Sequence, residues 1–570
     1  MSKMKSDEIL FVLHECRRFF VTTLIFSLAI NLLYLVSPLY MLQIYDRVIA
    51  SASEVTLIML TVILILALSA LSVLDFVRAR LLTQASIRIN QLLSSRIIAV
   101  AMQDAARAGL MRNSPLKDFD TFRQFITGPG IHAVFDLPWT PVYIIIIFML
   151  HPILGAFALV SSLVLILMAL LNEYIVRSPL AEANGAAAEN YNFTEMALRN
   201  AEVVQAMGMM PGLLNRWSKD RNFAIERQSA ASDRAAATQS TIRFLRLAMQ
   251  SLVLGLGAYL VIEHLTTTGS MFAASFLLGR ALQPVEQIVG SWRSLVSAQS
   301  AYRRIRQLLI KNPHFDSMLT LPKPAGRLSV ESLNYVIAGT NRHILRNVTL
   351  QIEPGESVGI IGPSGTGKST LLRQLVGILA PSAGVVRIDG ADVSTWPREL
   401  LGPHIGYLPQ DIELFSDSVV ANISRFRSGM DSDVLEAARL AGVHEMILRL
   451  PNGYETQVGN GGATLSGGYR QRIGLARAVF GNPSIVVLDE PSSNLDKDGE
   501  AALLACLSEL KQRKISVVVV SHQASTLDEV DKILVLRDGA VDFFGSRAEF
   551  LAKAQKTART LRSVPATSAV

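Results

Sequence analysis

The stretch Gly362-Pro-Ser-Gly-Thr-Gly-Lys-Ser-Thr370 decides the fold of one half of this chain. It follows a short apolar run, Ser357 to Ile361, and precedes a leucine-rich segment, Leu371 to Leu375. A loop of the pattern G-x-x-x-x-G-K-[ST] between a strand and a helix surrounds phosphate groups with backbone N–H groups, because its glycines allow close approach. The stretch therefore predicts an α/β P-loop NTPase domain.

Two side chains of this loop are expected to act on bound phosphates. Lys368 is expected to reach the β and γ phosphates of ATP, and the Ser369 hydroxyl is expected to ligate Mg²⁺. The loop residues assigned to ATP binding are Gly362, Pro363, Ser364, Gly365, Thr366, Gly367, Lys368, Ser369 and Thr370. The strand, loop and helix in this order favour a phosphate site over a chance match.

Two further apolar runs end in residues suited to nucleotide hydrolysis. The run Ile485 to Leu488 is followed by Asp489 and Glu490, and a run of valines precedes His522. We expect Asp489 to help hold Mg²⁺, and Glu490, which the metal does not neutralise, to polarise the attacking water as general base. His522 is expected to orient Glu490 and the γ phosphate, although an isolated histidine is more often a surface residue.

The composition shows that the rest of the chain is unusually apolar. Of 570 residues, 50% are hydrophobic and 18% are charged, and the mean hydropathy is +0.34. These values argue against a purely soluble protein, and a net charge of +7 is too modest to indicate a nucleic-acid partner. The two cysteines, Cys16 and Cys506, argue against a disulfide scaffold and fit a reducing compartment.

The first half contains apolar runs long enough to cross a bilayer, which takes about 20 residues. Six spans are predicted, at about 19–42, 57–77, 131–150, 153–176, 245–265 and 271–296. Buried helices of a soluble protein are the alternative, but runs such as Tyr143 to Leu150 carry no charge to leave in water. We therefore expect a helical membrane domain at 19–310 that contacts lipid, after a short cytoplasmic segment at 1–18.

The distribution of basic residues predicts the orientation of these spans. Arginines and lysines gather before the first span and after the second, whereas the connections after the first, third and fifth spans are nearly free of them. Positive charge is retained on the cytoplasmic side. Both termini and the ATP-binding domain of this multi-pass protein are therefore expected in the cytoplasm.

Several segments between and within the spans have two possible interpretations. The cytoplasmic connections 78–130 and 177–243 have helical spacing, and Asp118 to Phe125 and Leu213 to Trp217 are either contact points for another domain or simple surface turns. In the last span, Arg280, Glu286 and Arg293 must avoid lipid. They belong either to a polar translocation path or to ion pairs with neighbouring helices.

The hydropathy of the chain falls near Lys311, where the second half begins. A proline-bearing linker is expected at 311–326, followed by the ATP-binding domain at 327–552, in which short apolar strands alternate with helical segments. The tail 553–570, rich in Ala, Ser, Thr, Lys and Arg, is expected to be disordered.

With these motifs in order, the chain resembles the ATP-binding cassette family. Leu465 to Arg472 is similar to the family signature LSGGQ, with Tyr469 in place of the glutamine. The other counterparts are Gln410 as the Q-loop residue on ATP and the metal, Ser493 to Asp496 as the D-loop, His522 as the switch histidine, Tyr335 as the aromatic on adenine, and Glu455 to Gly461 as the cross-talk loop.

The resemblance implies a dimer. In that family the signature of one subunit, here Ser466, Gly467 and Gly468, contacts the ATP held by the phosphate loop of the partner subunit, and Asp496 lies at the same interface. This chain carries one set of each motif, so a homodimer with two ATP molecules is implied. The contact normally made by the signature glutamine is in doubt, because Tyr469 replaces it.

The membrane half resembles the PrtD-like branch of bacterial type I protein-secretion transporters. The resemblance is carried by Ser37 to Arg47 and by Phe135 to Tyr143. It implies a place in the bacterial inner membrane, a periplasmic membrane-fusion adaptor, an outer-membrane TolC-like channel and a largely unfolded polypeptide substrate with a C-terminal signal. The alternatives are an exporter of lipid or drug and an ATP-gated channel or regulator.

Overall fold

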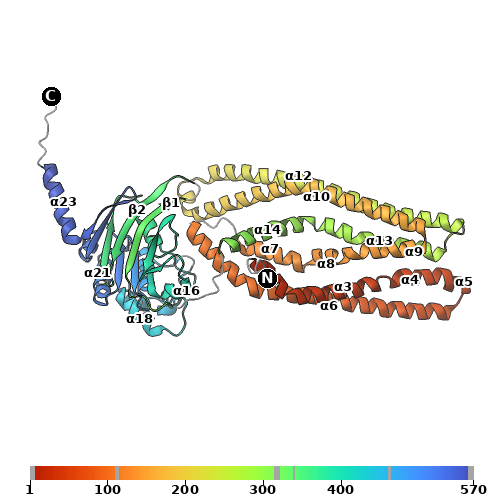
Figure 1. Ribbon diagram of the computed structural model, residues 1–570, viewed down its shortest axis with the longest axis horizontal. Coiled ribbons are helices and arrows are strands. Elements are labelled where there is room, and N and C mark those ends of the chain that lie inside the picture. The colour runs from red at the N-terminus through yellow and green to blue at the C-terminus, as the bar shows by residue number, and fades with distance from the viewer. Residues whose placement is uncertain are drawn as a thin grey trace, which may run out of the picture. The chain divides into compact units, whose positions relative to one another are not determined.

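The computed structural model describes residues 7–108, 115–312, 321–337, 340–459, 462 and 464–562. It divides into two compact units, Met1–His314 and Phe315–Val570. The first is helical and the second contains the strands, as the sequence predicted (Figure 1). Most of the predicted linker, at 313–320, lies outside the described residues.

The helical unit is dominated by three very long helices. They are α6 (Glu54–Ala108), α10 (Pro152–Arg199) and α12 (Met210–Ile262), and α10 and α12 lie side by side (Figure 1). The shorter helices are α2 (Glu8–Glu15), α3 (Arg17–Leu33), α4 (Val36–Gln43), α5 (Ile49–Ser51), α7 (Pro115–Thr127), α8 (Pro129–Asp136), α9 (Thr140–Leu150), α11 (Ala201–Ala206), α13 (Thr268–Gly290) and α14 (Trp292–Lys311). At 48 to 55 residues, the long helices exceed the roughly 20 needed to cross a bilayer.

Five segments of the described chain are long and apolar enough to cross a membrane. They are Arg17–Ser51, Glu54–Arg107, Pro115–Leu150, Pro152–Arg199 and Met210–Ile262. They contain the first four predicted spans and all but the last three residues of the fifth. The sixth predicted span falls on α13 and the first turn of α14, with a break at Ser291. Because α13 carries Arg280 and Glu286, it is less apolar than the others, and its crossing stays a prediction.

The two candidate contact segments differ in the structure. Residues 118–125 lie in the separate helix α7, whereas Leu213 to Trp217 continue α12 without interruption. The indole Nε1 of Trp217 donates to Thr194 Oγ1 of α10 at 3.0 Å, so this side chain joins α10 to α12. The chain turns instead at α11 and Met207 to Met209, which the sequence analysis did not single out.

A π-helical turn, η1 (Ile44–Val48), places Asp46 against the start of α13. The Asp46 carboxylate accepts hydrogen bonds from Thr267 Oγ1 at 2.7 Å and from the Gly269 N–H at 2.8 Å. A Cβ at Gly269 would lie 2.7 Å from the carboxylate atoms, so only glycine leaves room for it. Beside them Tyr45 stacks on Phe272 at 4.3 Å between ring centroids. This arrangement joins the turn to α13.

The second unit contains two sheets. A six-stranded sheet has the order β10-β9-β3-β8-β7-β6, and a four-stranded sheet has the order β2-β1-β4-β5. The strands are β1 (Leu328–Val336), β2 (His343–Ile352), β3 (Ser357–Ile361), β4 (Ala383–Ile388), β5 (Ala391–Asp392), β6 (Ile405–Leu408), β7 (Ile485–Asp489), β8 (Ser516–Val520), β9 (Lys532–Arg537) and β10 (Ala540–Ser546). Strands β6, β7, β8, β3 and β9 are parallel, so their carboxyl ends lie at one edge.

The helices of this unit complete an α/β domain. They are α15 (Lys368–Leu375), α16 (Arg398–Leu401), α17 (Val419–Ile423), α18 (Asp431–Leu440), α19 (His444–Leu448), α20 (Gly467–Val479), α21 (Lys497–Gln512), α22 (Ala524–Asp528) and α23 (Arg547–Arg562). The last of these corrects the predicted disordered tail, because residues 553–562 are helical. The alanines, leucine, lysines and glutamine of residues 553–562 favour a helix. Residues 563–570 lie outside the described part.

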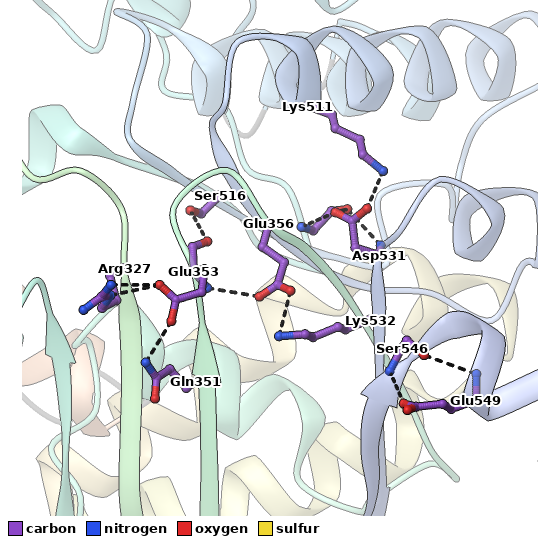
Figure 2. A network of polar contacts seen from close by, with 11 residues as sticks. Arg327, Gln351, Glu353, Glu356, Lys511, Ser516, Asp531, Lys532, Ser546 and Glu549 are labelled. Atoms are coloured by element: carbon purple, nitrogen blue, oxygen red, sulfur yellow. Dashed lines mark hydrogen bonds and ion pairs between the residues drawn. The ribbon is translucent and has the colours of Figure 1, made fainter.

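A polar network fastens the amino ends of β3 and β8 to β9 (Figure 2). Asp531 accepts hydrogen bonds from Ser357 Oγ at 2.6 Å and from Lys511 Nζ at 2.5 Å. Burial raises the pKa of the Asp531 carboxyl, but the bonds from Lys511 and Ser357 outweigh burial and hold that pKa below its usual value. Lys532 Nζ pairs with Glu356 at 2.7 Å in the same network.

Candidate ATP site

The phosphate loop connects β3 to α15, as the sequence predicted, and two glycines shape it. Gly367 is the N-cap of α15 with φ of 96°, a conformation that side chains with a Cβ rarely adopt. At Gly362, a Cβ would lie 2.4 Å from the Leu536 carbonyl oxygen of β9. The loop therefore lies tightly against the sheet, and the N-terminus of α15 follows it, where anions are favoured.

The side chain of Lys368 is folded back onto this loop. Its Nζ donates to the carbonyl oxygens of Gly362 at 2.7 Å and Pro363 at 3.0 Å, and the residue is only 7% exposed. A buried ammonium needs such partners, because an unpaired charge in the interior is strongly unfavourable. The Lys368 ammonium is thus already held within the phosphate loop.

Asp489 and Ser369 form a pair suited to a divalent cation. Asp489, at the end of β7, is 2% exposed, and its Oδ1 is buried without a hydrogen-bond partner in the described part of the chain. Burial raises the pKa of the Asp489 carboxyl, and a hydrogen bond with the Ser369 side chain partly opposes this. A buried carboxylate oxygen without a partner, next to a hydroxyl, fits a magnesium ion that prefers oxygen ligands. Among the described residues no cluster of three or more His, Cys, Asp or Glu side chains forms another metal site.

Three predicted site residues, Glu490, Gln410 and His522, lie together in the structure. Its Oε2 accepts a hydrogen bond from Gln410 Nε2 at 3.2 Å, and its Oε1 lies 3.7 Å from His522 Nε2. The structure therefore brings Gln410 to Glu490, and its part in metal binding stays a prediction. The backbone at Glu490 has φ of 49°, and its N–H donates to the Val520 carbonyl of β8 at 3.0 Å. Strained backbone of this kind is concentrated at functional sites.

Tyr335 lies in strand β1 of the four-stranded sheet. The neighbouring strand β2 passes close to the phosphate loop. It is half-buried and pairs across β1 and β2 with Leu345. The side chain of Leu345 is the nearest neighbour of a Cβ built at Gly367, at 2.9 Å. The pairing of these two strands thus brings Tyr335 to the neighbourhood of the loop.

The signature segment forms the start of α20. Ser466 is its N-cap and is exposed, and its Oγ accepts a long hydrogen bond from the Tyr469 N–H at 3.4 Å. Gly467 and Gly468 are the first residues of the helix, so N–H groups of its first turn are available to an anion. Tyr469 packs against the core of the domain, which gives the departure from LSGGQ a structural role.

Arg472 is a site residue that the sequence analysis missed. Its Nη2 donates to Asp496 Oδ1 at 2.7 Å, and Asp496 also caps α21 through the Gly499 N–H at 2.8 Å. The Gly499 and Arg472 hydrogen bonds lower the pKa of Asp496. The signature helix is thus joined to the D-loop. The predicted cross-talk loop at 455–461 is only partly described, because residues 460 and 461 lie outside the described part of the chain.

The phosphate loop, the two carboxylates at the end of β7 and a capped signature helix together define an ATP-binding cassette domain. Two family models match the chain, "ABC transporter" at residues 345–493 and "ABC transporter transmembrane region" at residues 20–284. The chain belongs to the ABC transporter family, in the branch of the type I secretion proteins. This confirms the family and the fold class predicted from the sequence.

Relatives along nearly the whole chain support this assignment. The chain is 38% identical over 553 residues to the type I secretion system ATP-binding protein PrsD of Rhizobium meliloti (strain 1021), covering 96% of this chain and 95% of that protein. It is 29% identical to the leukotoxin translocation protein LktB of Mannheimia haemolytica and 28% identical to the alpha-hemolysin translocation protein HlyB of Proteus vulgaris, in each case over 94% of this chain and 76% of the relative.

A solved structure shows the same architecture. A bacterial Atm1-family ABC exporter with ATP bound matches with a TM-score of 0.81 and 21% identity, over 97% of this chain and 99% of the other. At this identity the match supports the fold alone. The protein is therefore a multi-pass membrane protein with a nucleotide-binding domain.

Proposed function

We propose that this chain is the ATP-hydrolysing exporter of a type I secretion system in the bacterial inner membrane. The observation that carries the proposal is the arrangement around Glu490, with Gln410 at 3.2 Å and His522 at 3.7 Å, in a chain similar over 96% of its length to a type I secretion protein. It works as a homodimer with both ATP-binding domains in the cytoplasm. Its partners are a periplasmic membrane-fusion adaptor and an outer-membrane TolC-like channel.

The side chains divide the work of hydrolysis. ATP binds to the phosphate loop and Lys368, with adenine against Tyr335, and Ser466, Gly467 and Gly468 of the second copy complete the site. Glu490 accepts a proton from the attacking water as the water oxygen bonds to the γ phosphorus and the bond to the ADP oxygen breaks. Gln410 and His522 hold the Glu490 carboxylate in place. Ser369 and Asp489 would hold Mg²⁺, which offsets the negative charge of the phosphates.

The cargo of this exporter is a largely unfolded polypeptide with a C-terminal signal. The translocation proteins LktB and HlyB, named for leukotoxin and alpha-hemolysin, support a protein cargo over a lipid or a drug. ATP binding and hydrolysis give direction, because nucleotide shifts the membrane unit only through different affinities for its two states.

Replacing Glu490 by glutamine tests this mechanism. The purified Glu490→Gln protein is expected to bind ATP with the affinity of the parent while its hydrolysis rate falls by about 100-fold or more, because glutamine cannot accept the proton. Secretion of a polypeptide by cells carrying the variant with the adaptor and channel is expected to stop. Unchanged ATPase activity would contradict the role of Glu490, and stimulation by lipid or drug without an adaptor would contradict the cargo.

A further inference from the structure

The helical unit contains an open cavity of about 910 Å³ that no step of ATP hydrolysis uses. Helices α3, α6, α7, α8, α13 and α14 contribute to its wall, and they include parts of the predicted spans. The charged groups that line it are Asp75, Arg78, His132, Asp136, Arg280 and Arg293. Charges within predicted spans are expensive to bury in lipid and indicate function by default.

Both carboxylates of the cavity already have a cationic partner. Arg78 lies 2.7 Å from the Asp75 carboxylate and 3.4 Å from that of Asp136. Asp136 Oδ1 also accepts hydrogen bonds from Ser27 Oγ at 2.5 Å and Asn31 Nδ2 at 2.8 Å. This cluster joins α3, α6 and α8. Its single arginine compensates one of the two carboxylate charges, and its contacts hold the wall together.

The other two arginines have no carboxylate partner within 4 Å among the described residues. The Arg280 Cζ lies 3.8 Å from the centre of the Tyr34 ring, and its Nη1 donates to Gln283 Oε1 at 3.1 Å. Stacking on the tyrosine fixes the plane of the guanidinium and leaves other N–H donors free. On the same helix, Glu286 pairs with Arg246 at 2.5 Å. Glu286 is therefore one of the predicted structural ion pairs, whereas Arg280 and Arg293 face the cavity.

The two cavity arginines are spaced for an extended ligand. They are 13 positions apart on two consecutive helices, α13 and α14, which at about 1.5 Å per residue corresponds to at most roughly 20 Å along the helix axes. An extended peptide rises about 3.3 Å per residue, so about six residues would cover this length.

We propose that this cavity binds extended polypeptide with a preference for acidic segments, and that Arg280 and Arg293 contact carboxylates while Tyr34 positions Arg280. The proposal rests on the proposed function, since it specifies which polypeptide this exporter accepts. An arginine guanidinium offers a carboxylate two parallel N–H groups, which gives strong and oriented binding.

The remaining lining favours a peptide over a lipid. Amide and hydroxyl side chains face the cavity, namely Thr121, Gln124, Gln283, Gln287, Ser291, Ser294 and Ser297. Such groups hydrogen-bond to peptide N–H and C=O groups, which must find partners away from water. Acyl chains would instead require an apolar wall.

The test uses the full-length protein in nanodiscs of phosphatidylcholine without nucleotide. The probe is a fluorescent glycine and serine peptide with glutamates about six residues apart, and the matched peptide has glutamine at those positions. The parent protein is expected to bind the glutamate peptide at least about ten-fold more tightly. Arg280→Gln and Arg293→Gln are each expected to reduce this preference, and the double variant to remove it.

Two further variants separate recognition from folding. Arg280→Lys keeps the charge but not the flat stack on Tyr34, so we expect it to retain part of the preference. Arg234→Gln changes an exposed arginine of α12 outside the cavity and is expected to change nothing. Equal binding of both peptides, or a preference that survives the double variant, would overturn the proposal while leaving polypeptide export standing. Binding of phosphatidylglycerol with no binding of either peptide would overturn both.

Discussion

Asp46 and Gly269 are 223 positions apart, and the carboxylate of the first accepts the backbone N–H of the second at 2.8 Å. This bond connects a π-helical turn to the first turn of α13, where a negative charge also interacts favourably with the helix dipole. Because α13 carries Arg280, the contact determines where one wall of the cavity begins.

Removing either side of this contact should destabilise the membrane unit. We expect Asp46→Ala to cost about 2 to 3 kcal/mol, since two hydrogen bonds to a charged group are lost. Gly269→Ala should be at least as damaging, because its Cβ would lie 2.7 Å from the carboxylate. The measurement is thermal unfolding in detergent. In the double variant the clash partner is gone, so the effects should be less than additive; strict additivity would show that the two residues do not interact.

Replacing Lys368 by alanine should weaken ATP binding by about 10- to 100-fold, because a charged donor to the phosphates is lost. Nucleotide titration of the purified protein measures the change. Arg373→Ala on the same helix serves as a control for damage to α15. Unchanged affinity in Lys368→Ala would mean that the ammonium remains on its own loop when ATP is bound.

Gln410→Ala and His522→Ala should each lower the hydrolysis rate by about 10-fold or more, because each removes a neighbour of the Glu490 carboxylate. Steady-state ATPase assays will show a lower kcat, while ATP affinity measured separately should change less. A loss confined to affinity would instead indicate contact with nucleotide and not with the catalytic carboxylate.

Asp489→Asn should raise the stability of the nucleotide-free protein while removing magnesium-dependent ATPase activity. Burial raises the folded-state pKa of Asp489 above the unfolded value, so its ionised form opposes folding at neutral pH, and this penalty falls as the pH is lowered toward the raised pKa. Thermal unfolding of parent and variant across pH 5 to 8 measures the difference. A variant less stable than the parent at pH 8 would contradict the buried, unpartnered carboxylate.

Asp531 should behave in the opposite way. Its folded-state pKa is held below the usual value of an aspartate, so its contribution to stability is complete above that usual value and is lost as the pH falls through the lower, folded-state pKa. Asp531→Asn should therefore be less stable than the parent at neutral pH, with the gap closing below about pH 4. Glu549→Gln, at the end of the network, is the control; a gap independent of pH would show that charge is not involved.

The order of motifs was enough to predict the ATP site. Parallel strands end at one edge of a sheet, so Glu490 after β7 and His522 after β8 had to lie close together once the strands were recognised. The role of Gln410 at the metal stays a prediction, because the contact that the structure shows for its amide is with Glu490.

Long-range side-chain pairs could not be predicted in the same way. Nothing in the local sequence pairs Tyr34 with Arg280, or Arg472 with Asp496, because such contacts depend on how helices pack and not on periodicity. Likewise Leu213 to Trp217 carried a turn signal in Pro211-Gly212, yet proline is tolerated in the first turn of a helix and α12 begins there. Helix ends are where sequence patterns are least informative.

The two carbonyl oxygens that bind the Lys368 ammonium have a consequence for the ATPase cycle of this protein. An incoming nucleotide would not meet an unpaired ammonium. Its phosphates would replace the two carbonyl oxygens as partners of Lys368, and when the nucleotide leaves, the ammonium would return to these oxygens. The affinity for nucleotide is therefore set by the difference in free energy between two arrangements, and in both of them the Lys368 ammonium has partners. Such an exchange keeps the empty subunit intact and lets spent ADP leave without exposing an unsolvated cation.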